Sequence, residues 1–293
     1  LWREMKPNVF WRLVSVPVHD ETRDLISSFL FTSGAAGLVD HADRLEAYFQ
    51  NATDQPDAAV RTYLEELQQR GLPAEPDQVF GHAVADQDWN REWKKNYHPV
   101  RIGKRLLIRP SWEPVPVDAP ECVIEIDPEM AFGTGTHATT QLCLRMLEDH
   151  LQPGQRVLDV GTGTGILAIA AAKLGASRVA AFDVDEVAVE TAVRNAAVNG
   201  VDGVIAFSTA TMDSFEVADQ RFDWLVANIN RDQIVKMLPA MMEKCRYPLM
   251  IVLSGILVEE EPLLRDALSK YDLELCEISS QQEWLACLAQ KHT

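Results

Sequence analysis

The sequence lacks the features that mark secreted and membrane proteins. It has five cysteines in 293 residues. Because their number is odd and no two form a CxxC pair, we expect buried, reduced thiols and no disulfide framework. No run of roughly 18 uncharged apolar residues occurs, so no segment should span a membrane. The opening residues, Leu1 to Glu4, do not begin an apolar signal-peptide core, and we expect a cytoplasmic protein.

Basic residues are also scarce. Lys and Arg number 27 against 44 Asp and Glu, which gives a formal net charge of −17. Because binding to the phosphates of DNA or RNA needs clustered Lys and Arg, the charge argues against a nucleic-acid partner. It is compatible with a basic protein partner drawn in by the electrostatic field, although an acidic surface also serves solubility alone. We expect the chain to be a monomer.

The hydrophobic content of 47% is enough for one large domain and a small one. Residues 1–80 predict a small α+β domain, because strand, helix, strand, strand and helix patterns follow one another in the order of a split βαβ sandwich. These five patterns fall at residues 9–18, 21–32, 38–39, 44–49 and 58–69. No motif within them carries chemistry, so we expect this domain to recognise a partner or to complete the fold.

Residues 81–100 are expected to form a linker that contains a short helix. Trp89, Trp93 and Tyr97 recur every four residues, so they share one face of that helix. This aromatic face either packs against a neighbouring domain or faces the substrate.

Residues 101–293 predict an α/β domain with a mostly parallel sheet. Strands and helices alternate over most of this part, which implies helices on both faces of the sheet. The last two strands, residues 273–278 and 284–289, have no helix between them and should form an antiparallel hairpin. Two short strands, residues 105–108 and 122–126, precede the alternating part and are separated by a proline-rich stretch.

The first strand of the alternating part runs directly into a glycine-rich loop, Asp159 to Gly165. Gly161 and Gly163 let the backbone turn tightly and let a ligand approach, while the next helix presents free N–H groups at its positive end. A dinucleotide fingerprint, G-x-G-x-x-G, needs a glycine where this chain has Ile166. The spacing found here, G-x-G-x-G after an acid, resembles the first motif of class I, Rossmann-like S-adenosylmethionine-dependent methyltransferases.

Polar residues end two later strands of the same part. Asp183 lies 22 residues after Gly161 (183 − 161), where a carboxylate can accept hydrogen bonds from both hydroxyls of a ribose. Asp185 is a second candidate, although it is also placed to cap the following helix. Asn228 ends an apolar strand at the ligand-binding edge of the sheet. Its carbonyl can hold an amine in line with a methyl donor, or the residue serves only as a turn.

A second loop rich in glycine and threonine is expected at residues 126–140, before the alternating part. His137 in this loop acts either as a base or as a hydrogen-bond donor. The run from Phe132 to His137, FGTGTH, followed by Thr139 and Thr140, resembles the hallmark of the ribosomal protein L-11 methyltransferase family. Further similar stretches are Asn96 to Pro99, Arg105 to Trp112, Gly165 to Ala171, Ala227 to Ile229 and Leu253 to Leu257.

This resemblance implies a small N-terminal domain that recognises the ribosomal protein, a linker helix and a class I methyltransferase domain. It implies methyl transfer from S-adenosylmethionine to lysine ε-amines and/or the N-terminal α-amine of ribosomal protein L-11. We therefore expect Asn228 to position the amine, with no metal ion involved. The expected cofactor-binding residues are Thr140, Gly161, Gly163, Asp183 and Asn228, with Phe132 and Thr136 as secondary candidates.

The chain departs from the family pattern at two places. Thr162 stands in the glycine loop where the family often has Cys, and Asn230-Arg231 follows the strand end where a small apolar pair is usual. A lysine methyltransferase that acts on a different protein therefore stays open. An inactive S-adenosylmethionine-binding partner protein also stays open, and a NAD oxidoreductase is disfavoured by Ile166.

Overall fold

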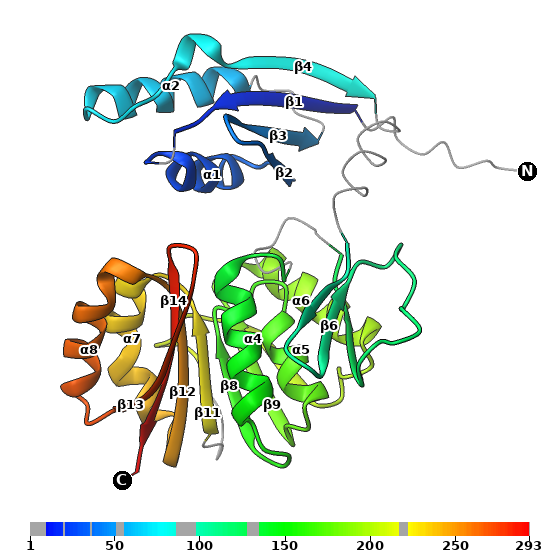
Figure 1. The fold of residues 1–293 in the computed structure, drawn as a ribbon, viewed down its shortest axis with the longest axis vertical. Coiled ribbons are helices and arrows are strands. Elements are labelled where there is room, and N and C mark those ends of the chain that lie inside the picture. Colours follow the sequence, from blue (N-terminus) through cyan, green and yellow to red (C-terminus); the bar gives the residue numbers. More distant parts are fainter. Residues whose placement is uncertain are drawn as a thin grey trace, which may run out of the picture. The chain divides into compact units, whose positions relative to one another are not determined.

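The computed structural model describes residues 10–19, 21–35, 37–50, 56–85, 98–127, 135–216 and 222–292. The chain divides into two compact units, residues 1–97 and residues 98–293 (Figure 1). Each unit has its own sheet and core and is considered by itself.

The N-terminal unit contains a four-stranded antiparallel sheet in the order β2-β3-β1-β4. Its elements are β1 (Phe10–Pro17), α1 (Arg23–Thr32), β2 (Gly37–Asp40), β3 (Arg44–Gln50), α2 (Pro56–Gln69), the 3-10 turn η1 (Pro76–Gln78) and β4 (Phe80–Ala85). Two βαβ units, β1-α1-β2 and β3-α2-β4, interleave in this order, so the predicted split βαβ sandwich is confirmed. The strand β4 was not predicted, and the expected boundary at residue 80 therefore falls inside the N-terminal sheet.

The core of the N-terminal unit lies between the sheet and its two helices. Val60, Leu64 and Leu67 are buried on one face of α2, at the i, i+4, i+7 spacing of an amphipathic helix. Phe29 of α1 stacks on Tyr63 of α2 with ring centroids 4.0 Å apart, so the two helices contact each other. One buried cluster joins both helices to β1 and β3.

The C-terminal unit begins with a small sheet of its own, β5 (Val100–Ile102), β6 (Leu106–Arg109) and β7 (Cys122–Glu125). β6 pairs antiparallel with β5 and parallel with β7. The buried carboxylate of Glu148 accepts hydrogen bonds from the backbone N–H groups of Lys104, at 2.5 Å, and Arg105, at 3.1 Å. These bonds attach the β5–β6 turn to the larger part of the unit.

The larger part contains a seven-stranded sheet in the order β10-β9-β8-β11-β12-β14-β13. Its strands are β8 (Arg156–Val160), β9 (Arg178–Asp183), β10 (Ile205–Thr209), β11 (Phe222–Asn228), β12 (Cys245–Leu257), β13 (Glu274–Gln281) and β14 (Trp284–Lys291). The first five are parallel, and β14 and β13 add an antiparallel edge. The predicted mostly parallel, Rossmann-like sheet with an antiparallel C-terminal hairpin is confirmed.

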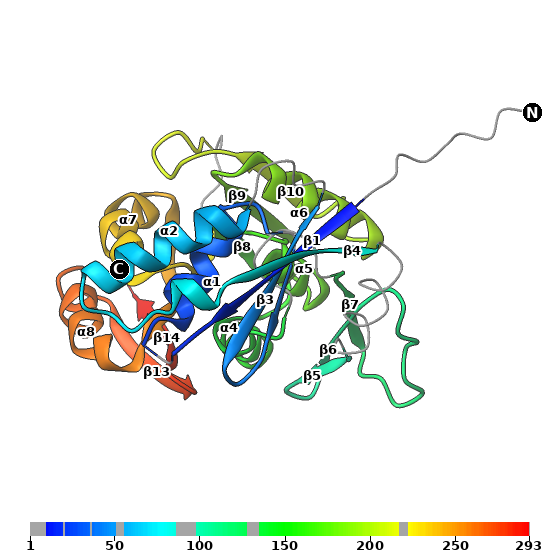
Figure 2. The same ribbon diagram turned by 90° about the horizontal axis from the view of Figure 1, so that it is seen from above.

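Helices cover both faces of this sheet (Figures 1 and 2). They are α4 (Ala138–His150), α5 (Ile166–Lys173), α6 (Glu186–Val198), α7 (Arg231–Glu243) and α8 (Glu261–Ser269), with the 3-10 turn η2 (Val258–Glu260) before α8. Successive strand residues face opposite sides. Val157 of β8 thus belongs to the core under α4 and α5, while its neighbour Leu158 belongs to the core under α7 and α8.

Two sequence-based expectations for this unit were wrong in detail. Residues 126–140 were expected to be a loop, but Thr139 and Thr140 lie buried in the first turn of α4. All five cysteines are free, and Cys122, Cys143, Cys245 and Cys287 are buried as expected. Cys276 is exposed, because it lies on β13, the outermost strand of the sheet.

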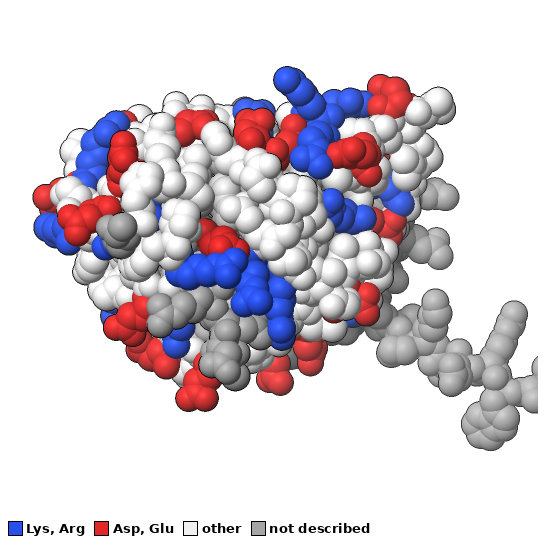
Figure 3. Space-filling view, turned by 90° about the horizontal axis from the view of Figure 1, so that it is seen from below, with Lys and Arg blue, Asp and Glu red and all other residues white. Residues whose placement is uncertain are grey.

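Charge is unevenly distributed over the C-terminal unit. Arg156 and Arg178 start neighbouring strands in direct register, and Arg246, near the start of β12, forms an ion pair with Asp223. Figure 3 shows one face on which Lys and Arg side chains lie near the middle, and further Lys and Arg lie toward the left edge and in the upper part of the view, with Asp and Glu beside them. Among the described residues, no helix is long and apolar enough to cross a bilayer.

Candidate functional site

The strand order reverses between β8 and β11, and the carboxyl ends of these two strands form the candidate ligand site. The chain proceeds outward from β8 through β9 to β10 and then returns to the other side of β8 as β11. In open α/β sheets, ligands bind in the crevice outside the strand ends at such a reversal. Gly161 follows β8 there, and Asp183 and Asn228 are the last residues of β9 and β11.

The glycine loop after β8 is tied to the neighbouring strand. The backbone N–H groups of Gly161 and Thr162 both donate to the carbonyl oxygen of Phe182, each at 3.0 Å. Gly161 has a φ of +73°, and a Cβ there would lie 2.7 Å from Cγ2 of Ile229. The loop therefore lies closer to the segment after β11 than any side chain at position 161 would permit.

Asp159 lies beneath this loop and is almost fully buried, with 1% of its surface exposed. Its Oδ2 accepts a hydrogen bond from the Thr162 hydroxyl at 2.7 Å. Burial in a low-dielectric interior is the main cause that raises the pKa of Asp159 to about 7, and the hydrogen bond from Thr162 opposes this rise. The departure from the family pattern at Thr162 thus supplies a hydroxyl donor to the buried acid.

Asp183 joins the end of β9 to the glycine loop. Its Oδ2 accepts from the backbone N–H of Gly163 at 2.9 Å, and its Oδ1 accepts from the N–H of Asp185 at 3.1 Å. Asp185 in turn caps α6, where its side chain accepts from the N–H of Val187 at 2.9 Å. Asp185 therefore has the capping role expected of it, and Asp183 is the carboxylate that contacts the loop.

Asn228 and Thr140 meet although 88 positions separate them. The Nδ2 of Asn228, at the end of β11, lies 3.3 Å from the Oγ1 of Thr140, in the first turn of α4. Thr140 is fully buried, and Asn228 is partly exposed. With its amide donating to Thr140, the side chain of Asn228 keeps its carbonyl oxygen as an acceptor. The structure thus brings together residues from two separate motifs.

His137 caps the helix α4. Its Nδ1 accepts from the backbone N–H of Thr139 at 3.3 Å and lies 2.7 Å from the Thr139 hydroxyl. Its ring packs edge-on against Trp284 with centroids 5.4 Å apart. These contacts give His137 a structural role in hydrogen bonding. Of the secondary candidates, Thr136 accepts a bond from Gln141 through its carbonyl, at 2.9 Å, and is exposed.

Some of the predicted residues lie outside the described part of the chain. Phe132 belongs to the interval 128–134, and the aromatic residues Trp89, Trp93 and Tyr97 belong to the interval 86–97. The predictions made for them stay predictions. Within the described ranges, no group of three or more His, Cys, Asp or Glu side chains is arranged to hold a metal ion.

Gly255 was not recognised as part of the site. It interrupts β12 with a φ of +84°, and the register between β12 and β14 shifts there. A Cβ at Gly255 would collide with the carbonyl oxygen of Ile229. An isolated glycine within an apolar strand pattern is the signal for such a bulge or close backbone approach.

The second departure from the family pattern has a structural explanation. Asn230 caps α7, since its side chain accepts from the N–H of Gln233 at 2.9 Å. The Nε of Arg231 donates to Oε1 of Glu260 at 2.9 Å, which attaches the start of α7 to η2. Both residues thus contribute to local structure at this edge of the sheet.

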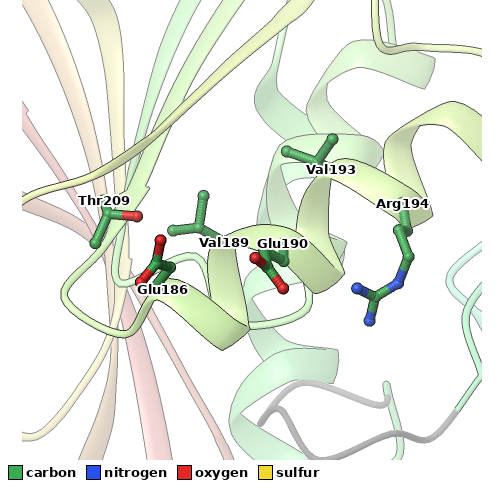
Figure 4. A pocket seen from close by; sticks show the side chains of 6 residues that line it. All are labelled: Glu186, Val189, Glu190, Val193, Arg194 and Thr209. Atoms are coloured by element: carbon green, nitrogen blue, oxygen red, sulfur yellow. The ribbon is translucent and has the colours of Figure 1, made fainter.

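A shallow hollow lies on the outer side of α6 (Figure 4). It is lined by Glu186, Val189, Glu190, Val193, Arg194 and Thr209. Two valines and two carboxylates face it, and Arg194 lies at its far end. The hollow shares no residue with the predicted cofactor site.

The raised pKa of Asp159 predicts a specific dependence of stability on pH. The unfolded aspartate has a pKa of about 3.9, so between about pH 4 and pH 7 the folded chain binds one proton more than the unfolded chain. The contribution of Asp159 to stability should therefore fall with rising pH in this window, by roughly 1 kcal/mol per unit. D159N removes this titration and keeps an acceptor for Thr162. Urea unfolding of both proteins at pH 5 and pH 7.5 measures the difference, and parallel curves would contradict the prediction.

The contact between Gly255 and Ile229 predicts that G255A is unusually destabilising. Alanine in the left-handed region costs about 1–2 kcal/mol by itself, and here its Cβ would also collide with a carbonyl oxygen. G200A is the matched control, because Gly200 has a φ of +68° and a Cβ there would have no other atom within 4 Å. We expect G255A to lose about 1–3 kcal/mol more than G200A in denaturant unfolding. Equal losses would show that the strand ends relax freely.

Comparison with known proteins agrees with this geometry. A family model described as ribosomal protein L11 methyltransferase (PrmA) matches residues 11–292. A ribosomal protein L11 methyltransferase of Caldanaerobacter subterraneus subsp. tengcongensis is 34% identical in an alignment of 309 positions. This alignment covers 96% of this chain and 99% of the relative. One of Pelotomaculum thermopropionicum is 43% identical over 220 residues, which cover 75% of this chain and 71% of the relative.

A solved structure is similar over about two thirds of this chain. The crystal structure of a ribosomal protein L11 methylase from Lactobacillus delbrueckii subsp. bulgaricus aligns with a TM-score of 0.62 and 32% identity, covering 67% of this chain and all of that one. The resemblance first drawn from the FGTGTH run and the glycine loop is thus confirmed over nearly the whole length. The chain belongs to the ribosomal protein L11 methyltransferase (PrmA) family of class I methyltransferases.

Proposed function

We propose that this protein transfers methyl groups from S-adenosylmethionine to ribosomal protein L11. The acceptors are lysine ε-amines and/or the N-terminal α-amine of that protein. The observation that carries the proposal is the meeting of Asp183, the glycine loop and the Asn228–Thr140 pair at one edge of the sheet. Membership of the family supports both the cofactor and the substrate.

The side chains and backbone at this edge fit S-adenosylmethionine. Asp183 uses two of its acceptor positions on backbone N–H groups, and a carboxylate has about four, so it can also accept from two ribose hydroxyls. Gly161 and Gly163 present bare backbone beside it. The N-terminus of α5, directly after the loop, suits the carboxylate of the methionine part.

We assign the cofactor contacts to Thr140, Gly161, Gly163, Asp183 and Asn228. Asn228 has a second role in this proposal, because its carbonyl oxygen can accept a hydrogen bond from the incoming amine and so orient its lone pair. Thr140 fixes the Asn228 amide by the contact at 3.3 Å. The Asn228–Thr140 pair therefore aligns the amine with the methyl group and does not take part in proton transfer.

The reaction needs a neutral amine and a correct line of attack. The cofactor supplies a methyl group on a positively charged sulfur, which is a good leaving group. A free lysine amine has a pKa of about 10.4 and must lose its proton before it attacks. Desolvation at the site lowers the pKa of the amine, and water can take the proton. Holding the reactants in line is then the main contribution of the protein.

We further propose that the N-terminal unit recognises the protein substrate and that the stretch predicted as a linker, residues 81–100, joins the two units. The net charge of −17 supports attraction of a lysine-bearing partner. We propose that the enzyme acts as a monomer in the cytoplasm.

Asp183 provides a test of the cofactor assignment. D183A should reduce the affinity for S-adenosylmethionine by at least about 100-fold, because it removes the ribose acceptors and releases the N–H of Gly163. Isothermal titration calorimetry measures this affinity. D185A is the control, since it removes a nearby acid and a helix cap but no ribose contact. Retained affinity in D183A would contradict the assignment.

Asn228 provides a test of the alignment role. N228A should lower kcat by about 10- to 100-fold, because a misdirected amine loses the advantage of orientation. The dissociation constant of the cofactor should change much less. N230A removes a helix cap two residues away and should leave kcat nearly unchanged. A loss confined to cofactor affinity would exclude alignment as the role of Asn228.

The proposed function itself is tested by mass spectrometry. Recombinant bacterial L11 is incubated with the protein and S-adenosylmethionine, and mass gains of about 14 Da per methyl group are mapped to amines. Transfer to L11 supports the proposal. If L11 stays unmodified while another protein in a cell extract gains label from a radioactive methyl donor, the substrate is different. Saturable cofactor binding without transfer to any protein would indicate an inactive partner protein.

A further inference from the structure

The helix α6 carries one asparagine, and a second follows at its C-terminal end; both hydrogen-bond to the backbone of other elements. Asn195 and Asn199 are four residues apart, so they lie on the same face of the helix end, and both are partly buried. Neither belongs to the predicted cofactor site. Each nevertheless contacts an element that leads to a part of that site.

Asn195 holds the glycine loop. Its Nδ2 donates to the carbonyl oxygen of Thr164 at 2.9 Å, and Thr164 is fully buried. The next residue, Gly165, has a φ of +83°, and a Cβ there would lie 3.0 Å from Cβ of Ala192 on the same helix. The second half of the glycine loop therefore rests on α6 through one hydrogen bond and one close contact.

Asn199 holds the strand β7. Its Oδ1 accepts from the backbone N–H of Glu125 at 2.9 Å, and its Nδ2 donates to the carbonyl oxygen of Glu125 at 2.7 Å. This two-way exchange imitates the hydrogen-bonded pair that a neighbouring strand would make. β7 is an edge strand of its small sheet, so the side chain of Asn199 covers its free backbone groups.

β7 leads into the segment that carries the FGTGTH run. The described chain resumes at Gly135, where a Cβ would lie 2.9 Å from Cγ2 of Ile108 on β6 and 3.2 Å from Cδ1 of Ile166. Ile166 is the first residue of α5, directly after the glycine loop. The end of this segment thus packs on both the small sheet and the glycine-loop helix, and α4 with Thr140 follows.

We propose that Asn195 and Asn199 are positioning residues that fix the two glycine-rich motifs relative to each other. Asn195 sets the glycine loop and thereby the affinity for the cofactor. Asn199 sets the small sheet, and through Gly135 and α4 it sets Thr140, which contacts Asn228. The first effect should appear in cofactor binding and the second in the transfer step. This division rests on the proposed function.

The test compares substitutions on the same helix. N195A should weaken binding of S-adenosylmethionine about tenfold, because the glycine loop loses the hydrogen bond that attaches it to α6. N199A should lower kcat at saturating cofactor about tenfold while the cofactor dissociation constant changes by less than about threefold. V198A is the control, since Val198 is 61% exposed and should leave both quantities unchanged.

Two further measurements separate positioning from mere stability. N195D has nearly the volume of asparagine but lacks the donor at neutral pH, and a protonated carboxyl can donate again. Its cofactor affinity relative to the unsubstituted protein should therefore recover as the pH falls toward about 4, close to the ordinary pKa of an aspartate. Urea unfolding of every variant shows whether losses in binding or kcat merely follow losses in stability, which would overturn the proposal.

A third measurement does not depend on the cofactor. In the ligand-free protein, amide hydrogen exchange at Gly163 to Gly165 should be faster in N195A than in V198A, and exchange near Glu125 should be faster in N199A. Unchanged exchange together with unchanged binding and kcat would refute the roles of both asparagines. If the unsubstituted protein fails to bind S-adenosylmethionine while the exchange differences hold, the proposed function is wrong and the positioning role stands.

Discussion

The candidate site depends on the close packing of Ile229 between two glycines. Gly161 follows β8, Ile229 follows β11 and Gly255 interrupts β12, so the carboxyl ends of three adjacent strands converge at one residue. A side chain on either glycine would collide with Ile229. This packing fixes the turn that follows Asn228, and with it the place of the Asn228 amide relative to the glycine loop. The chemistry proposed for the edge of the sheet follows from this backbone arrangement.

The sequence predicts those parts of the fold that have a local signal. Alternating strands and helices, each with a buried face, give the Rossmann-like sheet, and the missing helix between the last two strands gives the antiparallel edge. The helix α4 escaped prediction, since its first turn lies within a run of glycine and threonine and its cap is a histidine. The strand β4 escaped because prolines precede it, and only its pairing with β1 stabilises it as a strand.

The residues of the candidate site also divide into those with a local signal in the sequence and those without one. The glycine spacing and the acid 22 residues later are local patterns, so Gly161, Gly163 and Asp183 can be found from the residues alone. The contact between Thr140 and Asn228 spans 88 positions, and only resemblance to a family joined the two residues. The hydrogen bonds of Asn195 and Asn199 had no signal in the sequence, because an asparagine in a helix or at its end looks the same whether its amide faces water or a carbonyl oxygen.

Many polar groups at this edge of the sheet are used to hold the backbone. Asp183 accepts from two backbone N–H groups, Asn195 donates to the glycine loop, and Asp159 remains buried with its pKa raised to about 7. Ordering a loop at the moment of binding costs conformational entropy, and a loop already held by hydrogen bonds avoids most of that cost. A transfer that needs alignment more than proton movement benefits most from such prior order. The number of backbone contacts around the glycine loop is therefore the physical reason to expect positioning, rather than acid–base catalysis, from this site.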